Sequence, residues 1–292
     1  MSLNWNNYDE YFNHPRDQQQ IDDNTKLEME SIASEILGLD RQTVQSTWGS
    51  CSPPGVSAQT VVRVESSIPH RFTGICQNKA IGLKIFKNGK GCKMVHGHTH
   101  SRRKLPGLPN DFVQEVYDAG EHNGTFFLVQ GWIEGESLET YLNRKTQLPP
   151  DEVQQLLKDL FESIIIPLWS AGTIWWDIRA GNFCVTERDS KQRLVLIDTD
   201  SLLAYADEII ETPLVFTKRD KGKVFALKRI KTISTDLVLL AIPEENLKGS
   251  KTQLELQIKS ILNETLAPFE QSGPLQNGAE CFKSLEDKIV KK

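Results

Sequence analysis

The sequence predicts an α+β protein of two lobes, rich in strands in its first half and mainly helical in its second. Short β-type runs separated by turn signals extend as far as Gly131, and helical spacing of apolar residues begins after Gly135. A length of 292 residues also exceeds the usual size of one compact domain. We expect an N-terminal polar arm and helix over residues 1–45, a first lobe over 46–131 and a second lobe over 132–292.

The first half contains one predicted helix and five predicted strands. The helix is TKLEMESIASEILGL after Asn24, with Leu27, Ile32, Ile36 and Leu37 as its apolar stripe. We expect the strands to form one five-stranded antiparallel sheet, with turn signals such as Asn88-Gly89 and GEHNG between them. The predicted strands are Thr60–Glu65, Arg71–Cys76, Ala80–Phe86, Phe112–Tyr117 and Thr125–Gly131.

The second half contains longer helical patterns. Pro150 to Trp169 begins with proline and two acidic residues, and its apolar residues are spaced for one buried stripe. Ser137–Asn143 and Thr252–Leu266 are also predicted to be helical. The predicted extended segments are Phe183–Thr186, Leu194–Ile197 and Ile209–Thr217.

Composition and charge exclude several classes of protein. Hydrophobic residues make up 38% of the chain, which is enough for a core, and the net charge of −5 argues against a general nucleic-acid binder. Residues 66–110 nevertheless hold nine Lys and Arg and no acid, which indicates either a solvated face or a surface that receives phosphate groups. Because the sequence shows no secretory signal and no membrane span, we expect a cytoplasmic protein without a membrane partner.

Cysteine and histidine form one cluster that suits a metal. His96, His98 and His100 alternate along the chain, and Cys92 lies just before them. On a strand the three imidazoles would point the same way, a geometry that suits Zn²⁺, but such runs also occur as polar surface. The five cysteines form no CxxC pair, so a disulfide or zinc framework is not expected.

The stretch from Trp175 to Asp200, WWDIRAGNFCVTERDSKQRLVLIDTD, holds the clearest chemical pattern. Asp177, Asn182 and Asp198 follow a buried helix and lie at loop positions beside short strands. Carboxylate and amide oxygens are the ligands that Mg²⁺ prefers, and phosphoryl transfer needs a further carboxylate to orient the attacking hydroxyl. Taken singly, each of these residues could instead cap backbone amides in a turn.

These motifs resemble those of the protein-kinase-like superfamily. DIRAGN resembles its catalytic loop, LIDTD its metal-binding turn and AIGLK its phosphate-binding lysine motif. The resemblance covers roughly residues 61–203 and implies a bilobal fold with a five-stranded N-lobe sheet and a mainly helical, shortened C-lobe. It also implies that the protein binds ATP and Mg²⁺.

The resemblance assigns a role to each matching residue. Asp177 would be the base for the acceptor hydroxyl, and Arg179 would help to neutralise the transferring phosphoryl group. Asn182 and Asp198 would bind the metal, with Asp200 as either a further ligand or a turn residue. Lys84 would bind the α and β phosphates of ATP. Gln130 would be the gatekeeper, and Gly131 with Trp132 would offer backbone hydrogen bonds to adenine.

Two departures from the family pattern leave three functions open. SSIPH at residues 66–70 has none of the glycines that usually cover the phosphates, and residues 89–110 contain no glutamate to pair with Lys84. Candidate substitutes for that glutamate are Glu28, Glu30 and Glu35 of the N-terminal helix, and Glu115. The open functions are a serine/threonine-protein kinase, a pseudokinase that binds nucleotide or a regulatory partner, and a small-molecule kinase. We favour the first, with a protein substrate as its partner, and the sequence does not define an oligomeric state.

Overall fold

The chain forms two compact units in a computed structural model. The structure describes residues 23–47, 58–77, 79–86, 111–170, 173–175, 178–198, 202–204 and 214–242, together with parts of 252–260. One unit lies within residues 1–91 and 117–130, and the other within 92–116 and 131–292. The chain therefore leaves the first unit between Gln130 and Gly131.

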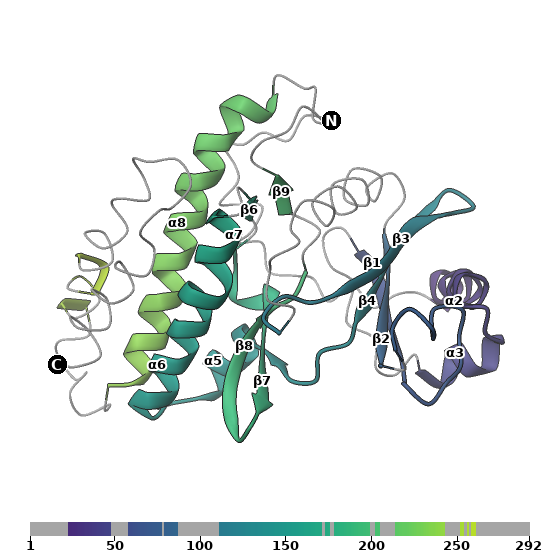
Figure 1. Cartoon of the computed structure of the whole chain (residues 1–292), viewed down its shortest axis with the longest axis horizontal. Helices are drawn as coiled ribbons and strands as arrows, with labels where there is room; N and C mark the ends of the chain where they lie inside the picture. The colour runs from purple at the N-terminus through teal and green to yellow at the C-terminus, as the bar shows by residue number, and fades with distance from the viewer. Residues whose placement is uncertain are drawn as a thin grey trace. The chain divides into compact units, whose positions relative to one another are not determined.

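A four-stranded sheet forms the first unit (Figure 1). Its order is β1-β2-β4-β3, and β1 and β2 pair antiparallel with Lys84 opposite Val61. Asn123 and Gly124 both have positive φ, 48° and 79°, as the two-residue turn of a twisted hairpin requires, and they join β3 to β4. The strands are β1 (Ala58–Val64), β2 (Ile81–Phe86), β3 (Val116–His122) and β4 (Thr125–Gly131).

The predicted fifth strand, Arg71–Cys76, is wrong, because the sheet has four strands among the described residues. This segment consists of turns closed by short-range backbone bonds, such as Thr73 N to His70 O at 3.0 Å. Two side chains reinforce them, since the His70 amide donates to Thr73 Oγ1 at 2.7 Å and the Phe72 amide donates to His70 Nδ1 at 3.1 Å. These local partners replace the cross-strand bonds that a strand would need.

The predicted N-terminal helix is confirmed as α2 (Asp23–Leu37), which is followed by α3 (Arg41–Thr47). The buried face of α2 is formed by Met29, Ala33, Ile36 and Leu37, which share one apolar cluster with β1, β2 and β4. Leu27 was expected on this face but is 46% exposed, because the helical period that buries Met29 and Ala33 turns Leu27 away. Apolar burial thus fixes α2 on the sheet.

Helices α5 (Leu138–Arg144) and α6 (Pro150–Lys158) open the helical part of the second unit. The expected helix from Pro150 continues through a π-helical stretch, η3 (Asp159–Ile165), into α7 (Ile166–Ser170). In Figure 1 the long helix α8 (Leu214–Leu240) runs beside α6, which it contacts. The extended segment predicted over Ile209–Thr217 is therefore wrong from Leu214 onward. In the described part of the chain no helix combines the length and apolar character needed to cross a membrane.

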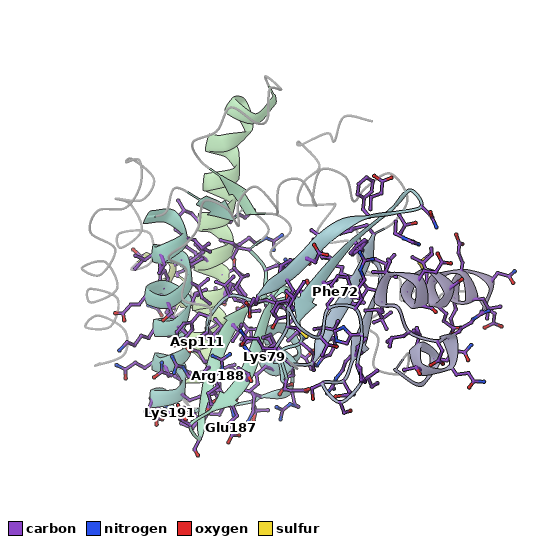
Figure 2. All side chains as sticks on the ribbon, turned by 45° about the vertical axis from the view of Figure 1, so that its right-hand side comes forward. Phe72, Lys79, Asp111, Glu187, Arg188 and Lys191 are labelled. Carbon is purple, nitrogen blue, oxygen red and sulfur yellow. The ribbon has the colours of Figure 1, made fainter. Side chains whose placement is uncertain are left out.

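Two small sheets complete the second unit. β5 (Glu136–Ser137), β7 (Phe183–Arg188) and β8 (Lys191–Leu196) form one in the order β5-β7-β8. β6 (Thr173–Trp175) and β9 (Leu202–Ala204) form the other. Figure 2 shows the charged side chains of Glu187, Arg188 and Lys191 at the turn of the β7–β8 hairpin. The hairpin turn thus lies at the surface. The opposite end of the hairpin, where β7 begins and β8 ends, is its open end.

The predicted strand Phe112–Tyr117 is divided between two partners. Residues 112–114 run beside the end of β8, with backbone bonds from Leu196 N to Phe112 O at 2.8 Å and from Gln114 N to Leu196 O at 2.7 Å. Val113 forms a parallel bridge with Leu196, and β3 begins only at Val116. The segment therefore supports the end of β8.

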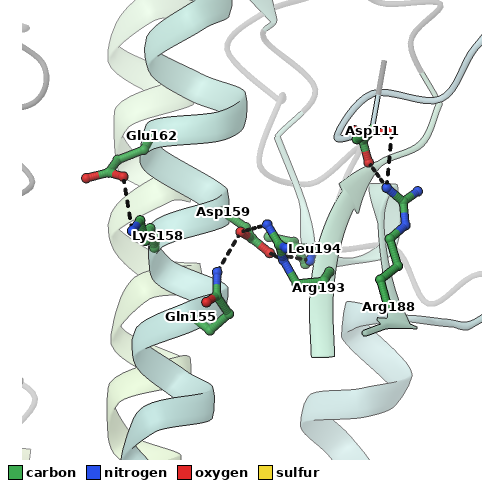
Figure 3. Close-up of polar contacts among 8 residues, drawn as sticks. All are labelled: Asp111, Gln155, Lys158, Asp159, Glu162, Arg188, Arg193 and Leu194. Atoms are coloured by element: carbon green, nitrogen blue, oxygen red, sulfur yellow. Dashed lines mark hydrogen bonds and ion pairs between the residues drawn. The ribbon is translucent and has the colours of Figure 1, made fainter. Parts of the chain in front are cut away.

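A buried ion pair fixes β8 to the helices (Figure 3). The Asp159 carboxylate is 1% exposed and accepts from Arg193 Nε at 2.9 Å and from Arg193 Nη2 at 3.0 Å. It also accepts from the backbone amide of Leu194 at 3.0 Å and from Gln155 Nε2 at 3.0 Å. These bonds to Asp159 raise the pKa of Arg193 above its usual value. They hold the strand that leads to Asp198.

Gly135 is required where β5 begins, and we expect Gly135→Ala to lower the free energy of unfolding by about 3 kcal/mol or more. Its φ is +151°, and an added Cβ would overlap the carbonyl oxygen of Val185 and lie 2.7 Å from Cys184 Sγ. Equilibrium denaturation measures the loss. The matched control is Gly124→Ala, where φ is also positive at +79° but nothing lies within 4 Å, so we expect a cost of about 1 kcal/mol. Equal losses in the two variants would contradict the close approach at Gly135.

Candidate functional site

The β7–β8 hairpin brings Asn182 close to the chain segment that carries Asp198. Asn182 ends a short 3-10 helix, η4 (Ala180–Asn182), immediately before β7, and Asp198 follows β8 by two residues. Because the two strands are antiparallel, their outer ends meet, and the Ile197 amide donates to the Asn182 carbonyl at 2.9 Å. Two residues predicted to bind metal therefore lie on bonded neighbouring segments.

The backbone of Asp198 has an uncommon conformation. Its φ is +62°, in the left-handed region that residues other than glycine seldom adopt. Such conformations cost free energy and concentrate at functional sites, where the surrounding structure holds them in place. Asp198 is half-buried, and Asn182 is buried at 2% exposure. The hairpin thus presents a carboxylate and a primary amide, both of which can supply oxygen ligands.

Arg179 orients the side chain of Asn182. Its Nε donates to Asn182 Oδ1 at 3.2 Å, across the single turn of η4. The amide oxygen of Asn182 therefore faces a guanidinium. The structure therefore places Arg179 beside a predicted metal ligand. Asp177, Asp200 and the cluster of Cys92, His96, His98 and His100 lie outside the described residues.

The Gly131 peptide already has hydrogen-bond partners on both sides. Its amide donates to the Glu115 carbonyl at 2.8 Å, and its carbonyl accepts from Gln114 Nε2 at 2.8 Å. A carbonyl oxygen can accept two bonds, so the Gly131 carbonyl can still receive one from a ligand, whereas its amide is committed to Glu115. The adenine contact expected of Gly131 and Trp132 stays a prediction, and Trp132 is half-buried.

Gln114 is a site residue that the sequence did not single out. Besides its bond to Gly131, its Oε1 accepts from the backbone amide of Asp198 at 3.3 Å. The side chain is buried at 7% exposure. The available signal was a glutamine inside the mostly apolar run FVQEVY. A side-chain amide is expected in such a buried segment only where its polar atoms have hydrogen-bond partners.

Lys84 and Gln130 belong to the first unit. Lys84 lies on β2, where all six side chains are buried, and is itself 4% exposed. Its Nζ is 5.4 Å from the centre of the Phe86 ring, close enough for a cation–π contact. Gln130, at 8% exposure, lies on the neighbouring strand β4. A lysine buried to this extent is typical of a charge held for a partner rather than of a solvated surface.

Two of the three acids of the N-terminal helix proposed as partners of Lys84, Glu30 and Glu35, have other partners. Glu30 is buried and accepts from Gln45 Nε2 at 2.8 Å and Arg41 Nε at 3.4 Å, joining α2 to α3. Glu35 pairs with His122 at 2.7 Å, joining α2 to the β3–β4 hairpin. The two carboxylates therefore have structural contacts that account for their positions.

Cys184, two residues after Asn182, supplies a pH-dependent prediction. Burial, together with the charges of Glu134 and Glu136, raises the pKa of its thiol from 9.0 to about 11. The protonated thiol therefore stabilises the fold fully below pH 9, and this contribution is lost as the pH rises to 11. We expect a loss of roughly 2–3 kcal/mol across that interval. Chemical denaturation at several pH values measures it, and Cys184→Ser, which has no group titrating there, should show a flatter profile. Parallel profiles for the two proteins would rule out this linkage.

Comparisons with known proteins place this geometry in a fold class. No protein-family model matches the chain, and no curated protein matches it. Among solved structures, the crystal structure of Rad53 1-466 in complex with AMP-PNP matches with a TM-score of 0.51 at 15% sequence identity. The match covers 80% of this chain and 58% of that one.

The chain therefore has a protein-kinase-like fold. This confirms the resemblance drawn from DIRAGN, LIDTD and AIGLK at the level of the fold. In the described residues there is no group of three or more His, Cys, Asp or Glu side chains that could together hold a metal ion. A metal bound by Asp198 and Asn182 would therefore need further ligands, which phosphate oxygens or water can supply.

Proposed function

We propose that this protein is an ATP- and Mg²⁺-dependent phosphotransferase that phosphorylates a Ser or Thr hydroxyl of a protein substrate. One observation carries the proposal: the bonded approach of Asn182 to the segment of Asp198, whose backbone has the left-handed conformation. The protein-kinase-like fold also supports the proposal, and the solved structure that it resembles contains the nucleotide analogue AMP-PNP.

The donor set fits Mg²⁺. Asp198 supplies a carboxylate, and Asn182 supplies an amide oxygen, which also accepts from Arg179. Hard cations prefer such oxygen ligands, and Mg²⁺ usually keeps few protein ligands and fills its remaining positions with water and substrate phosphates. When bound there, Mg²⁺ would neutralise charge on the phosphates of ATP.

The residues of this chain then divide the work. Lys84 would pair with the α and β phosphates, and the Gly131 carbonyl would accept from the adenine amine. Asp177 orients the acceptor hydroxyl and takes its proton, which places the nucleophile in line with the phosphoryl group. Arg179 holds the Asn182 amide and adds positive charge beside the transferring group. Asp200, two residues beyond Asp198, is proposed as a further metal ligand.

The test is transfer of label from γ-labelled ATP to acceptors of different classes. The purified chain is incubated with Mg²⁺, a degenerate library of Ser- and Thr-containing peptides, and a panel of small alcohols and aminoglycosides. We expect labelled peptides, labelling of the chain itself or both, with the signal abolished by EDTA and by Asp177→Asn. Labelled small alcohols without labelled peptides would indicate a small-molecule kinase instead.

A pseudokinase is the second candidate, and the connection between β1 and β2 favours it. Residues 66–77 form local turns, where a glycine-rich hairpin would cover the phosphates. A nucleotide held without that cover would be bound less tightly. ATP binding without label on any acceptor would support this second function and overturn the first.

A further inference from the structure

We propose that Gln114 is a positioning residue that holds the peptide of Asp198 against the carbonyl of Gly131, so that the Asp198 carboxylate is preorganised for Mg²⁺. This inference rests on the proposed function and deepens it. It concerns a residue that touches neither metal nor nucleotide in the proposed mechanism. It also explains why an uncharged amide is buried at the start of a segment that otherwise packs through apolar side chains.

The main chain of Gln114 is fixed by β8. Bonds from Leu196 N to Phe112 O at 2.8 Å and from Gln114 N to Leu196 O at 2.7 Å align the segment with the end of that strand. The next amide available for such pairing belongs to Asp198. It donates instead to the side chain, Gln114 Oε1, at 3.3 Å. The Gln114 side chain thus extends the pairing of β8 by one amide, where the backbone of the segment has turned toward Gly131.

The other end of the same side chain faces an acceptor. Gln114 Nε2 donates to the Gly131 carbonyl at 2.8 Å. Because a primary amide has one oxygen that accepts and one nitrogen that donates, its two bonds fix its orientation, and a flipped amide would meet a donor with a donor. At 7% exposure, water is largely excluded from replacing either partner.

This arrangement acts on a strained residue. Asp198 has a φ of +62°, which the chain adopts only if neighbouring contacts maintain it. The bond to Gln114 holds the amide nitrogen of Asp198, which is one end of the N–Cα bond about which φ rotates. The bond from Ile197 N to Asn182 O at 2.9 Å holds the preceding peptide. Loss of the Gln114 bond would therefore free the Asp198 backbone while leaving its approach to Asn182 in place.

The test compares Gln114→Met, which keeps the length of the side chain but removes both bonds, with Val113→Ala on the same segment. Val113 belongs to the apolar core, so its truncation destabilises this segment without touching the amide network. Two quantities are measured: hydrogen exchange at the Asp198 amide in the protein without nucleotide or metal, and the Mg²⁺ concentration that gives half-maximal phosphoryl transfer from ATP.

We expect Gln114→Met to accelerate exchange at Asp198 about fivefold or more relative to amides of α6, and to raise the required Mg²⁺ concentration by a similar factor. Val113→Ala should change neither the exchange rate at Asp198 relative to α6 nor the required Mg²⁺ concentration. Unaltered exchange in Gln114→Met would overturn the proposal, as would faster exchange with an unchanged Mg²⁺ requirement. If the parent protein transfers no phosphoryl group, the proposed function fails, and with it the metal role of Gln114, whereas the exchange result still reports whether the contact holds the turn.

Discussion

Replacing Asp159 with alanine is expected to lower the free energy of unfolding by about 3–5 kcal/mol, the usual cost of breaking one side of a buried ion pair. The carboxylate is 1% exposed and accepts two bonds from Arg193, one from the Leu194 amide and one from Gln155. Its removal leaves the Arg193 guanidinium, whose side chain is 25% exposed, and the buried Leu194 amide without these partners. Equilibrium unfolding in urea, followed by tryptophan fluorescence, measures the loss.

A surface ion pair on the same helical segment provides the control. Lys158 and Glu162 are 3.9 Å apart and partly exposed, so Glu162→Ala should cost less than about 1 kcal/mol. The Glu162 effect should also shrink in high salt, whereas the Asp159 effect should not, because buried pairs are little screened. A loss below 1 kcal/mol in Asp159→Ala would show that this network does not hold β8.

Replacing Asp198 with asparagine is expected to reduce phosphoryl transfer at least about 100-fold with little effect on stability. Asparagine tolerates a left-handed backbone, so a φ of +62° can be kept, and the side chain keeps its size. What is lost is the negative charge that favours a divalent cation. Initial rates at saturating ATP, together with unfolding curves, separate the chemical effect from a structural one.

The same substitution at Asp111 is a matched control. Asp111 is 84% exposed and pairs with Arg188 at 3.6 Å on the surface of the second unit. Asp111→Asn removes one carboxylate from the same unit and should leave the rate within twofold. An Asp198→Asn enzyme as active as this control would remove Asp198 from the proposed mechanism.

Elements dominated by periodic apolar residues could be predicted from the sequence. The spacing of apolar residues gave α2 and the helix that begins at Pro150, and β-branched runs gave β1, β2 and β4. The motif around Asn182 and Asp198 was predictable because both residues flank short strands that pair as a hairpin. In these segments the local sequence pattern favours the same structure as the tertiary packing, so the sequence pattern was enough to predict the structure.

The wrong and missing predictions share a physical cause. In each case the structure depends on contacts that the spacing of apolar residues in the sequence does not reveal. Arg71–Cys76 has the composition of a strand, but Thr73 and His70 satisfy the backbone locally. The end of the extended segment predicted over Ile209–Thr217 belongs instead to helix α8, whose later residues Ile230, Ile233 and Val238 are buried in the core. Gln114 could not be assigned because its partners, Gly131 and Asp198, are distant in sequence.

Nucleotide-dependent stabilisation tests the central claim most directly. Unfolding of the parent protein is measured without nucleotide, with ATP and EDTA, and with ATP and Mg²⁺, and the series is repeated for Asp198→Asn. With ATP at 100 times its dissociation constant, Mg²⁺ and ATP together should stabilise the parent by about 2.7 kcal/mol, and ATP with EDTA should stabilise it much less. Asp198→Asn should lose most of the difference that Mg²⁺ makes. Identical unfolding of the parent in all three conditions, at millimolar ATP, would contradict the account.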